Sequence, residues 1–352
     1  MAATAQVRRG GRRVSRSRFV VLLVAALLVI GAALYLSTLR HLPRDPRGTR
    51  LFPGFAAKLD TVSAVGIGHG GGTPLVTLHR TGDRWTVAQR GDYPADIRKL
   101  RTLLRSLGDA ALLEEKTSMP ANYPLIGVGA DGTTVTLTAP DGARAVIIGK
   151  PAGGGVFARR PSEAKSYLIE PAVAVGTEPS RWIDPHLIDV APGDIERLAV
   201  EPAVGPAYAI HRIGPGGFAL DAIPLHRTAL DARVLAPPPD AFGALTAEDV
   251  LPESALPAAA AGAMKSTATL TLKGGAVVKF AGTASGEKHW VQIRDGRDAA
   301  SASRAQGRAF EVASYRYDAI FRPLEQLLQP PPKPALQPKP ASSPKPARKP
   351  AA

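Results

Sequence analysis

A long uncharged stretch near the N-terminus places the strongest constraint on how this chain can fold. It begins at Phe19, ends at Leu39 and contains 21 residues, FVVLLVAALLVIGAALYLSTL, without a charged side chain. A helix rises roughly 1.5 Å per residue, so this stretch can span about 30 Å, the thickness of a bilayer's hydrocarbon core. A removable signal peptide is the alternative, but its apolar part is usually about 7 to 15 residues long. Residues 19–39 are therefore predicted to form a single transmembrane helix that stays uncleaved.

The basic residues before this stretch predict its orientation. Residues 1–18 contain six arginines and no acidic residue. An excess of Arg and Lys beside a membrane span is usually retained in the cytoplasm. Residues 1–18 are therefore predicted to be a basic cytoplasmic stub, and the polar remainder of the chain is predicted to lie outside the cytoplasmic membrane.

The distribution of charge argues against a nucleic-acid partner. The formal net charge is +14. However, residues 1–50 hold ten basic residues and one acidic residue, residues 330–352 hold five basic residues and no acidic one, and residues 51–329 hold 29 of each sign. A nucleic-acid-binding domain normally concentrates basic residues on its folded body. We therefore expect no nucleic-acid partner.

Beyond the span, the sequence predicts a stalk and then an α+β unit. Residues 40–58 contain three prolines and two glycines, which favours an extended stalk. Period-two patterns predict strands at residues 61–67, 74–79, 84–88, 134–138, 145–148, 156–160 and 166–170, with a tight turn at residues 141–142. A leucine stripe between Asp96 and Gly108 predicts a helix. The first module, residues 59–192, is thus predicted to be a mainly antiparallel sheet covered by one helix.

A repeat relates the two halves of the polar region. Residues 77–82 (TLHRTG) are echoed by residues 209–214 (AIHRIG), and residues 133–138 are echoed by residues 267–272, at offsets of 132 and 134 residues. Two matches at nearly the same offset indicate a duplicated structural unit. We therefore predict a second α+β module at residues 193–329. Its helical region contains three consecutive prolines, so a loop or a two-part helix is expected there.

The C-terminal segment, residues 330–352, has the composition of a disordered tail. Proline alternates with lysine and alanine, which is typical of polyproline II structure and leaves too few apolar residues for a core. A solvated tail without a defined partner is the favoured interpretation, and contact of its basic residues with anionic lipid heads or cell-wall polymer is the alternative.

Three patterns suggest chemistry, and each has a simpler explanation. The Gly-rich residues 68–72 lack the Gly-Lys-Ser/Thr of a phosphate-binding loop and lie between strands. Ser162 and Lys165 have the Ser-x-x-Lys spacing of penicillin-interacting enzymes, but no Ser-Asp-Asn or Lys-Thr-Gly accompanies them. The joint between the modules holds Asp184 and Asp189 without a histidine at metal-site spacing, and the chain contains no cysteine. We therefore expect no enzyme activity, no cofactor and no metal.

The repeat also aligns two His-Arg pairs, His79 with Arg80 and His211 with Arg212. A repeated pair of this type could bind a phosphate or carboxylate on each module. Duplicated modules also retain equivalent surface residues without a ligand. These four residues are weak candidates for ligand contact.

Four short motifs in the first module follow one another in a characteristic order. They are residues 147–150 (IIGK), 154–159 (GGVFAR), 167–169 (YLI) and 182–184 (WID). This order resembles the bacterial family named domain of unknown function 4340 over residues 60–200, with a weaker second copy to residue 328. Residues 123–127 (YPLIG) depart from the Tyr-Gly-Leu turn that is more usual in the family.

The resemblance implies a membrane-anchored protein of the bacterial envelope. Such proteins are often associated with transport systems of the gliding-motility type, which couple an ATPase and a permease, and the family has no assigned catalytic residues. We therefore expect a protein of the bacterial inner membrane with its bulk in the periplasm. Its expected role is a non-catalytic accessory or scaffolding subunit of an ABC-type envelope transport complex, with membrane proteins as partners.

A lipid- or glycan-binding carrier or sensor in the cell envelope is the alternative function. A deep apolar pocket between the two modules would favour this alternative. A flat apolar patch or an exposed sheet edge would favour protein partnership instead.

Overall fold

The structure is a computed structural model that describes residues 16–39, 47–295 and 299–330. The predictions for the first 15 residues of the stub, for residues 40–46 of the stalk and for the tail from residue 331 onward lie outside this part of the chain. The described part contains both helices and antiparallel sheets, which confirms the mixed α and β fold class with antiparallel sheets.

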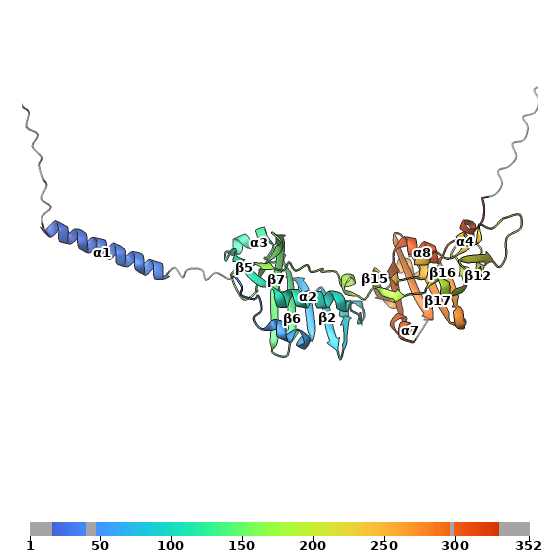
Figure 1. The fold of residues 1–352 in the computed structure, drawn as a ribbon, viewed down its shortest axis with the longest axis horizontal. Coiled ribbons are helices and arrows are strands. Elements are labelled where there is room, and N and C mark those ends of the chain that lie inside the picture. Colours follow the sequence, from blue (N-terminus) through green and yellow to red (C-terminus); the bar gives the residue numbers. More distant parts are fainter. Residues whose placement is uncertain (1–15, 40–46, 296–298, 331–352) are drawn as a thin grey trace, which may run out of the picture.

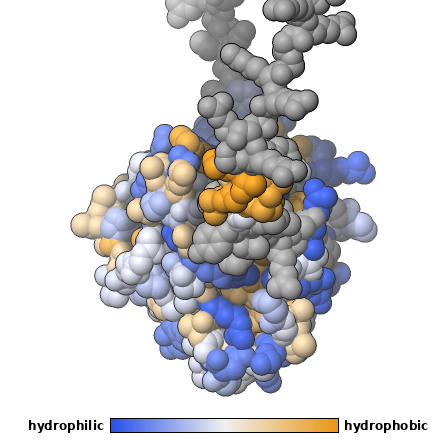
Figure 2. All heavy atoms as spheres, turned by 90° about the vertical axis from the view of Figure 1, so that its left-hand side faces the viewer, coloured by the Kyte–Doolittle hydropathy of each residue, from blue (hydrophilic) through white to orange (hydrophobic). Residues whose placement is uncertain are grey.

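The predicted span lies within α1 (Arg16–Leu39), a helix of 24 residues. The side chains described in α1 are those of residues 20, 21 and 23–33, and all of them are exposed. Figure 2, which faces the α1 side of Figure 1, shows an orange apolar group in front of a body with many blue and white residues. Among the helices of the described residues, none meets the length and hydropathy required of a membrane span.

The first module contains a nine-stranded antiparallel sheet with the order β4-β3-β2-β1-β6-β7-β8-β9-β5 (Figure 1). Its strands are β1 (Ala64–His69), β2 (Val76–Thr81), β3 (Arg84–Val87), β4 (Tyr93–Pro94), β5 (Ala111–Glu115), β6 (Thr133–Ala139), β7 (Gly142–Ala152), β8 (Gly155–Arg159) and β9 (Ser166–Glu170). The predicted strands lie within a few residues of these bounds. The turn between β6 and β7 falls at residues 140–141, next to the predicted position, with Ala139 paired to Gly142.

Helix α2 (Ile97–Asp109) packs its leucine stripe onto one face of this sheet, as predicted. The side chain of Asp96 accepts hydrogen bonds from two backbone amides of the first turn, at 3.0 and 3.1 Å, and so caps the helix. The buried leucines of the helix are Leu100, Leu103, Leu104 and Leu107. Gly108 lies inside the last turn of the helix rather than beyond it. A Cβ atom there would be only 3.3 Å from the Cα of Ala56, so the close packing of η1 favours glycine at this position.

Residues 50–58 belong to the first module, so the prediction of an extended stalk is wrong for them. Arg50 forms a β-bridge with Ala111, and residues from Phe55 onward form a 3-10 helix, η1 (Phe55–Thr61). The side chains of Leu51 and Phe55 are completely buried. The Pro and Gly content correctly indicated that no α-helix continues here. The segment is compact because each large apolar side chain that it buries stabilises it by about 1.5 to 3 kcal/mol.

The second module contains an eight-stranded antiparallel sheet with the order β13-β12-β11-β16-β17-β18-β19-β15. Its strands are β11 (Ile195–Glu201), β12 (Tyr208–Gly214), β13 (Gly217–Leu220), β15 (Asp249–Pro252), β16 (Lys265–Leu272), β17 (Val277–Ser285), β18 (Lys288–Asp295) and β19 (Arg308–Val312). This is the order of the first sheet without its edge strand β4. The two pairs of repeated segments lie on strands that occupy equivalent places in the two sheets, β2 and β12, and β6 and β16, and β11 has the same place in its sheet as β1.

The helical region of the second module is divided into two short helices, as predicted from its prolines. These are α4 (Ala232–Leu235) and α5 (Pro239–Phe242). The other short helices of the modules are α3 (Tyr123–Ile126), α6 (Ala258–Ala261), α7 (Ala299–Ala305) and α8 (Ser314–Ile320). A two-stranded sheet of β10 (His186–Ile188) and β14 (Leu245–Thr246) pairs the joint with the second module, and one buried core cluster includes residues of both large sheets.

Candidate functional site

The two candidate arginines lie on the equivalent strands β2 and β12, and both have a structural role. Arg80 donates hydrogen bonds to the backbone carbonyls of Asp60 and Gly82, each at 2.8 Å. Arg212 donates to the carbonyl of Ile195 at 2.7 Å, and to carbonyls in the preceding 3-10 helix and in the following turn. In each module, the arginine therefore ties the turn after its strand to the segment that leads into the first strand.

The two candidate histidines each lie against a carboxylate of their own module. The Nε2 atom of His79 is 3.3 Å from the carboxylate of Asp92, and the Nδ1 atom of His211 is 2.7 Å from that of Asp221. Burial would raise the pKa of Asp221, but hydrogen bonds from His211 and Arg197 outweigh it and hold that pKa below its usual value. The two His-Arg pairs lie on different sheets, so the structure does not combine them into one site.

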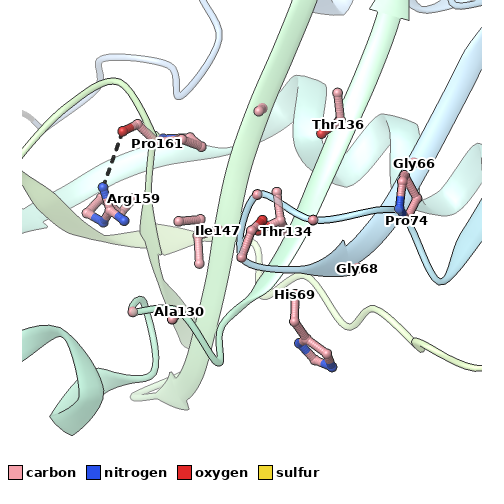
Figure 3. Close-up of a pocket in the computed structure, with 15 residues that line it drawn as sticks. Gly66, Gly68, His69, Pro74, Ala130, Thr134, Thr136, Ile147, Arg159 and Pro161 are labelled. Carbon is pink, nitrogen blue, oxygen red and sulfur yellow. Dashed lines mark hydrogen bonds between the residues drawn. The ribbon is translucent and has the colours of Figure 1, made fainter.

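A groove crosses the face of the first sheet that points away from the core (Figure 3). Its volume is about 580 Å³. The floor consists of small or apolar residues that alternate with the buried core residues of β1, β6 and β7, namely Gly66, Gly68, Thr134, Thr136, Ala145 and Ile147. The floor therefore offers methyl groups, hydroxyls and backbone rather than charge.

The rim of this groove carries a guanidinium whose Nε and Nη1 atoms already donate to backbone carbonyls. Arg159 stacks on the ring of Tyr123 at 4.5 Å and donates to the carbonyls of Val128 at 3.2 Å and Glu163 at 3.0 Å. Figure 3 shows its further hydrogen bond to the carbonyl of Pro161. The Gly-rich residues 68–72 also line the groove. Residues 68 and 69 end β1, and only residues 70–72 begin the predicted connection to β2. An uncharged floor of small residues beside a guanidinium that already has several partners is a poor match to an isolated anion.

The two modules contact each other through a polar and aromatic interface. Arg90 forms a bidentate pair with Asp249, with Nε–Oδ1 and Nη2–Oδ2 distances of 2.6 and 3.0 Å, and the two side chains are only 18% and 17% exposed. The ring of Tyr93 meets that of Phe310 edge-on at 5.8 Å, and Arg308 lies over Tyr93 at 5.7 Å. No sequence motif indicated this interface, because its partners are far apart in the chain.

Alkaline pH is expected to weaken this interface through Tyr93. Burial raises the pKa of Tyr93 to about 12, so the folded protein keeps the phenol neutral. The buried, neutral phenol stabilises the folded protein fully below pH 10. As the pH rises from 10 toward 12, the free energy of unfolding falls by up to about 1.4 kcal/mol per pH unit. Urea unfolding between pH 8 and pH 11.5 should therefore show a smaller alkaline decline in Tyr93→Phe than in the parent.

Tyr208 provides the matched comparison for this measurement. Burial raises its pKa to about 12 as well, but it lies within the second module, where its hydroxyl donates to the carbonyl of Arg322 at 2.7 Å. Tyr208→Phe should reduce the alkaline decline in the same way without affecting the interface. An alkaline decline in stability that is unchanged in Tyr93→Phe would show that ionisation of Tyr93 does not cause it.

The remaining sequence patterns have ordinary structural partners. The Nζ atom of Lys165 is 2.9 Å from Glu115, and the resulting hydrogen bond raises the pKa of Lys165, which is the opposite of what a general base needs. Asp184 pairs with Arg304 at 3.1 Å, and Asp189 accepts a hydrogen bond from a backbone amide at 2.9 Å. Within the part of the chain that the structure describes, no group of three or more His, Cys, Asp or Glu side chains could hold a metal ion.

Two antiparallel sheets of equivalent strand order, each packed against short or amphipathic helices, define a duplicated α+β protein. The family described as domain of unknown function (DUF4340) matches residues 85–261, about half of the 352 residues, and the chain belongs to this family. The predicted resemblance is thereby confirmed; the matched region begins after residue 60, and it ends between residue 200 and the end of the weaker second copy at residue 328. Comparisons with curated proteins and with solved structures found no match.

Proposed function

We propose that this protein is a single-pass protein of the bacterial inner membrane and acts as a non-enzymatic accessory or scaffolding subunit of an envelope transport complex. In this proposal α1 is the anchor, the N-terminus is cytoplasmic and both modules lie in the periplasm. The exposed apolar surface of α1 carries the proposal, since large side chains such as Leu28 and Val29 are each 69% exposed. Contiguous apolar surface of this kind is unfavourable in water and favourable in a bilayer.

Two features of the modules support contact with other proteins as the mode of action. The groove on the first sheet offers a floor of small side chains and backbone over about 580 Å³. The interface through Arg90 and Asp249 holds the two sheets in one arrangement, so a partner would meet a preorganised surface. Contact between the tail and anionic lipid or cell-wall polymer stays a prediction, because residues 331–352 lie outside the described part.

Crosslinking of the full-length protein in native membranes tests the anchor and the partners together. After solubilisation, we expect a permease and an ATPase to copurify with the chain in stoichiometric amounts. The double variant Leu27→Arg with Ile30→Arg should leave the membrane fraction and lose these partners, because a charge at the centre of a span costs about 2.5 to 3.5 kcal/mol. The matched control, Leu27→Ile with Ile30→Leu, keeps the hydropathy and should behave like the parent.

The two parts of the proposal fail in different ways. A parent protein found in the soluble fraction would contradict the anchor. A parent protein that stays in the membrane but is recovered alone would contradict the role as a subunit.

The second candidate function is a carrier or sensor that binds a lipid or a glycan. One observation favours it, a hollow of about 460 Å³ between the modules, which lies beside the interface and is lined by Trp85 and Arg308 among others. Ligand sites occur preferentially at interfaces between domains.

A further inference from the structure

The hollow between the modules has walls from both of them, and their polar side chains carry both signs of charge. The β2–β3 hairpin and the segment after it contribute Arg84, Trp85 and Asp92. The joint contributes Asp184, and the second module contributes Arg304 and Arg308. We call this hollow the intermodule cleft.

The walls of the intermodule cleft are held in place without a ligand. Backbone hydrogen bonds join the segment before α2 to the joint: the amide of Asp96 donates to the carbonyl of Trp182, and the amide of Asp184 donates to the carbonyl of Pro94, each at 2.8 Å. On the other side, the Nη2 atom of Arg308 donates to the carbonyl of Gly91 at 3.0 Å. A ligand would therefore enter a formed site and lose little free energy in ordering it.

The charges in the cleft select for a ligand that is polar but neutral. An anion would face the carboxylates of Asp92 and Asp184, and a cation would face the guanidiniums of Arg304 and Arg308. A hydroxyl group satisfies both kinds of side chain, since it donates to a carboxylate and accepts from a guanidinium. A lipid chain would cover Asp92 and the pair of Asp184 with Arg304 without offering either a hydrogen bond, and would remove them from water.

Trp85 and Asp92 provide an aromatic surface and a carboxylate that also suit a neutral polar ligand. Trp85 packs against the core cluster on one side and lines the cleft on the other, so part of an aromatic surface is available to a ligand. Asp92 has a φ of 55°, a conformation that few non-glycine residues adopt, and its side chain is 64% exposed. The backbone at this position thus presents a carboxylate to the cleft.

We propose that the intermodule cleft binds a neutral oligosaccharide, with Trp85 as the stacking surface and the acidic and basic side chains as hydrogen-bonding partners for its hydroxyls. The volume of about 460 Å³ falls within the usual range of small-ligand sites. This site deepens the second candidate function, and it does not depend on whether a permease and an ATPase copurify with the chain.

Titration of the full-length protein in a detergent without a sugar headgroup tests the proposal. The probes are the tetrasaccharides of maltose, cellulose and chitin type, compared with an anionic heparin-derived tetrasaccharide and cationic chitosan tetraose. Trp182 and Trp290 are only 3% and 2% exposed, so a ligand in the cleft should change the fluorescence of Trp85 selectively. We expect saturable binding of at least one neutral probe at millimolar concentration, measured by fluorescence and by calorimetry.

Two variants locate the binding, and one control accompanies them. Trp85→Phe should abolish the fluorescence response and weaken calorimetric binding about tenfold. Asp92→Asn should weaken binding with the fluorescence response retained, and Lys165→Gln, which lies outside the cleft, should bind like the parent. Circular dichroism melting shows whether each variant is folded.

Three results would overturn the proposal. The first is the absence of binding for all neutral probes, and the second is binding of the charged probes alone. The third is neutral-probe binding that is unchanged in both folded variants, which would place the sugar elsewhere on the chain. None of these results bears on the transport-complex proposal, which the copurification experiment tests independently.

Discussion

Gly149→Ala should destabilise the first module by about 2 to 3 kcal/mol, as expected when an atom is forced into a packed site. Gly149 lies in β7, where a Cβ atom would be 2.3 Å from the carbonyl oxygen of Ile126 and 2.8 Å from the Cγ1 atom of Val128. Relief of the first contact requires movement of backbone, because the obstructing atom is a carbonyl rather than the end of a flexible side chain. Urea unfolding of parent and variant measures the change from the shift in midpoint at constant m-value.

Gly193→Ala is the matched control, since it makes the same chemical change in the joint. No atom lies within 4 Å of the position that its Cβ would take, and its φ is not in the left-handed region. A substitution there should change the unfolding free energy by less than about 0.5 kcal/mol. Equal effects of the two variants would contradict the packing explanation and would point to a general cost of replacing glycine in this chain.

Local patterns in the sequence predicted those elements whose ends are fixed by nearby residues. Asp96 caps α2 through hydrogen bonds to amides of its first turn, so the start of the helix is encoded within a few positions. The turn between β6 and β7 is likewise fixed by neighbouring residues, with Ala139 paired to Gly142. Residues 50–58 were assigned wrongly because their fold depends on burial of Leu51 and Phe55 in the core of the first module, which composition does not reveal.

The candidate site was less predictable than the fold, for a related reason. The repeat correctly placed His79 and His211 on equivalent strands, but it could not show that Arg80 and Arg212 donate to backbone carbonyls. The intermodule cleft combines side chains that are far apart in the chain, so no motif of fixed spacing describes it. Trp85 was not predicted as a site residue, because it lines the cleft only together with residues of the second module.

Asp249→Ala should destabilise the contact between the modules by about 2 to 3 kcal/mol, because it leaves the Arg90 guanidinium in a largely buried position without its partner. The two residues are 159 positions apart, so their pair closes a long loop and reports on the tertiary arrangement rather than on one module. Arg90→Ala should have a similar effect. The double variant should cost less than the sum of the two, with a coupling energy of about 1 to 3 kcal/mol in urea unfolding.

Asp295→Ala is the matched control for this cycle. Asp295 pairs with Lys279 at 3.0 Å, but both side chains are more than half exposed, so the loss of this pair should cost less than about 1 kcal/mol.

The interface itself can be observed directly, because the chain contains no cysteine and two introduced ones can be labelled uniquely. Spin labels at Arg101→Cys in α2 and Lys265→Cys in β16 should give a narrow distance distribution in the parent. The distribution should broaden in Asp249→Ala and stay narrow in Asp295→Ala. A distribution that is narrow in all three would mean that the aromatic contact of Tyr93 with Phe310 suffices to hold the modules, and that the ion pair does not fix their arrangement.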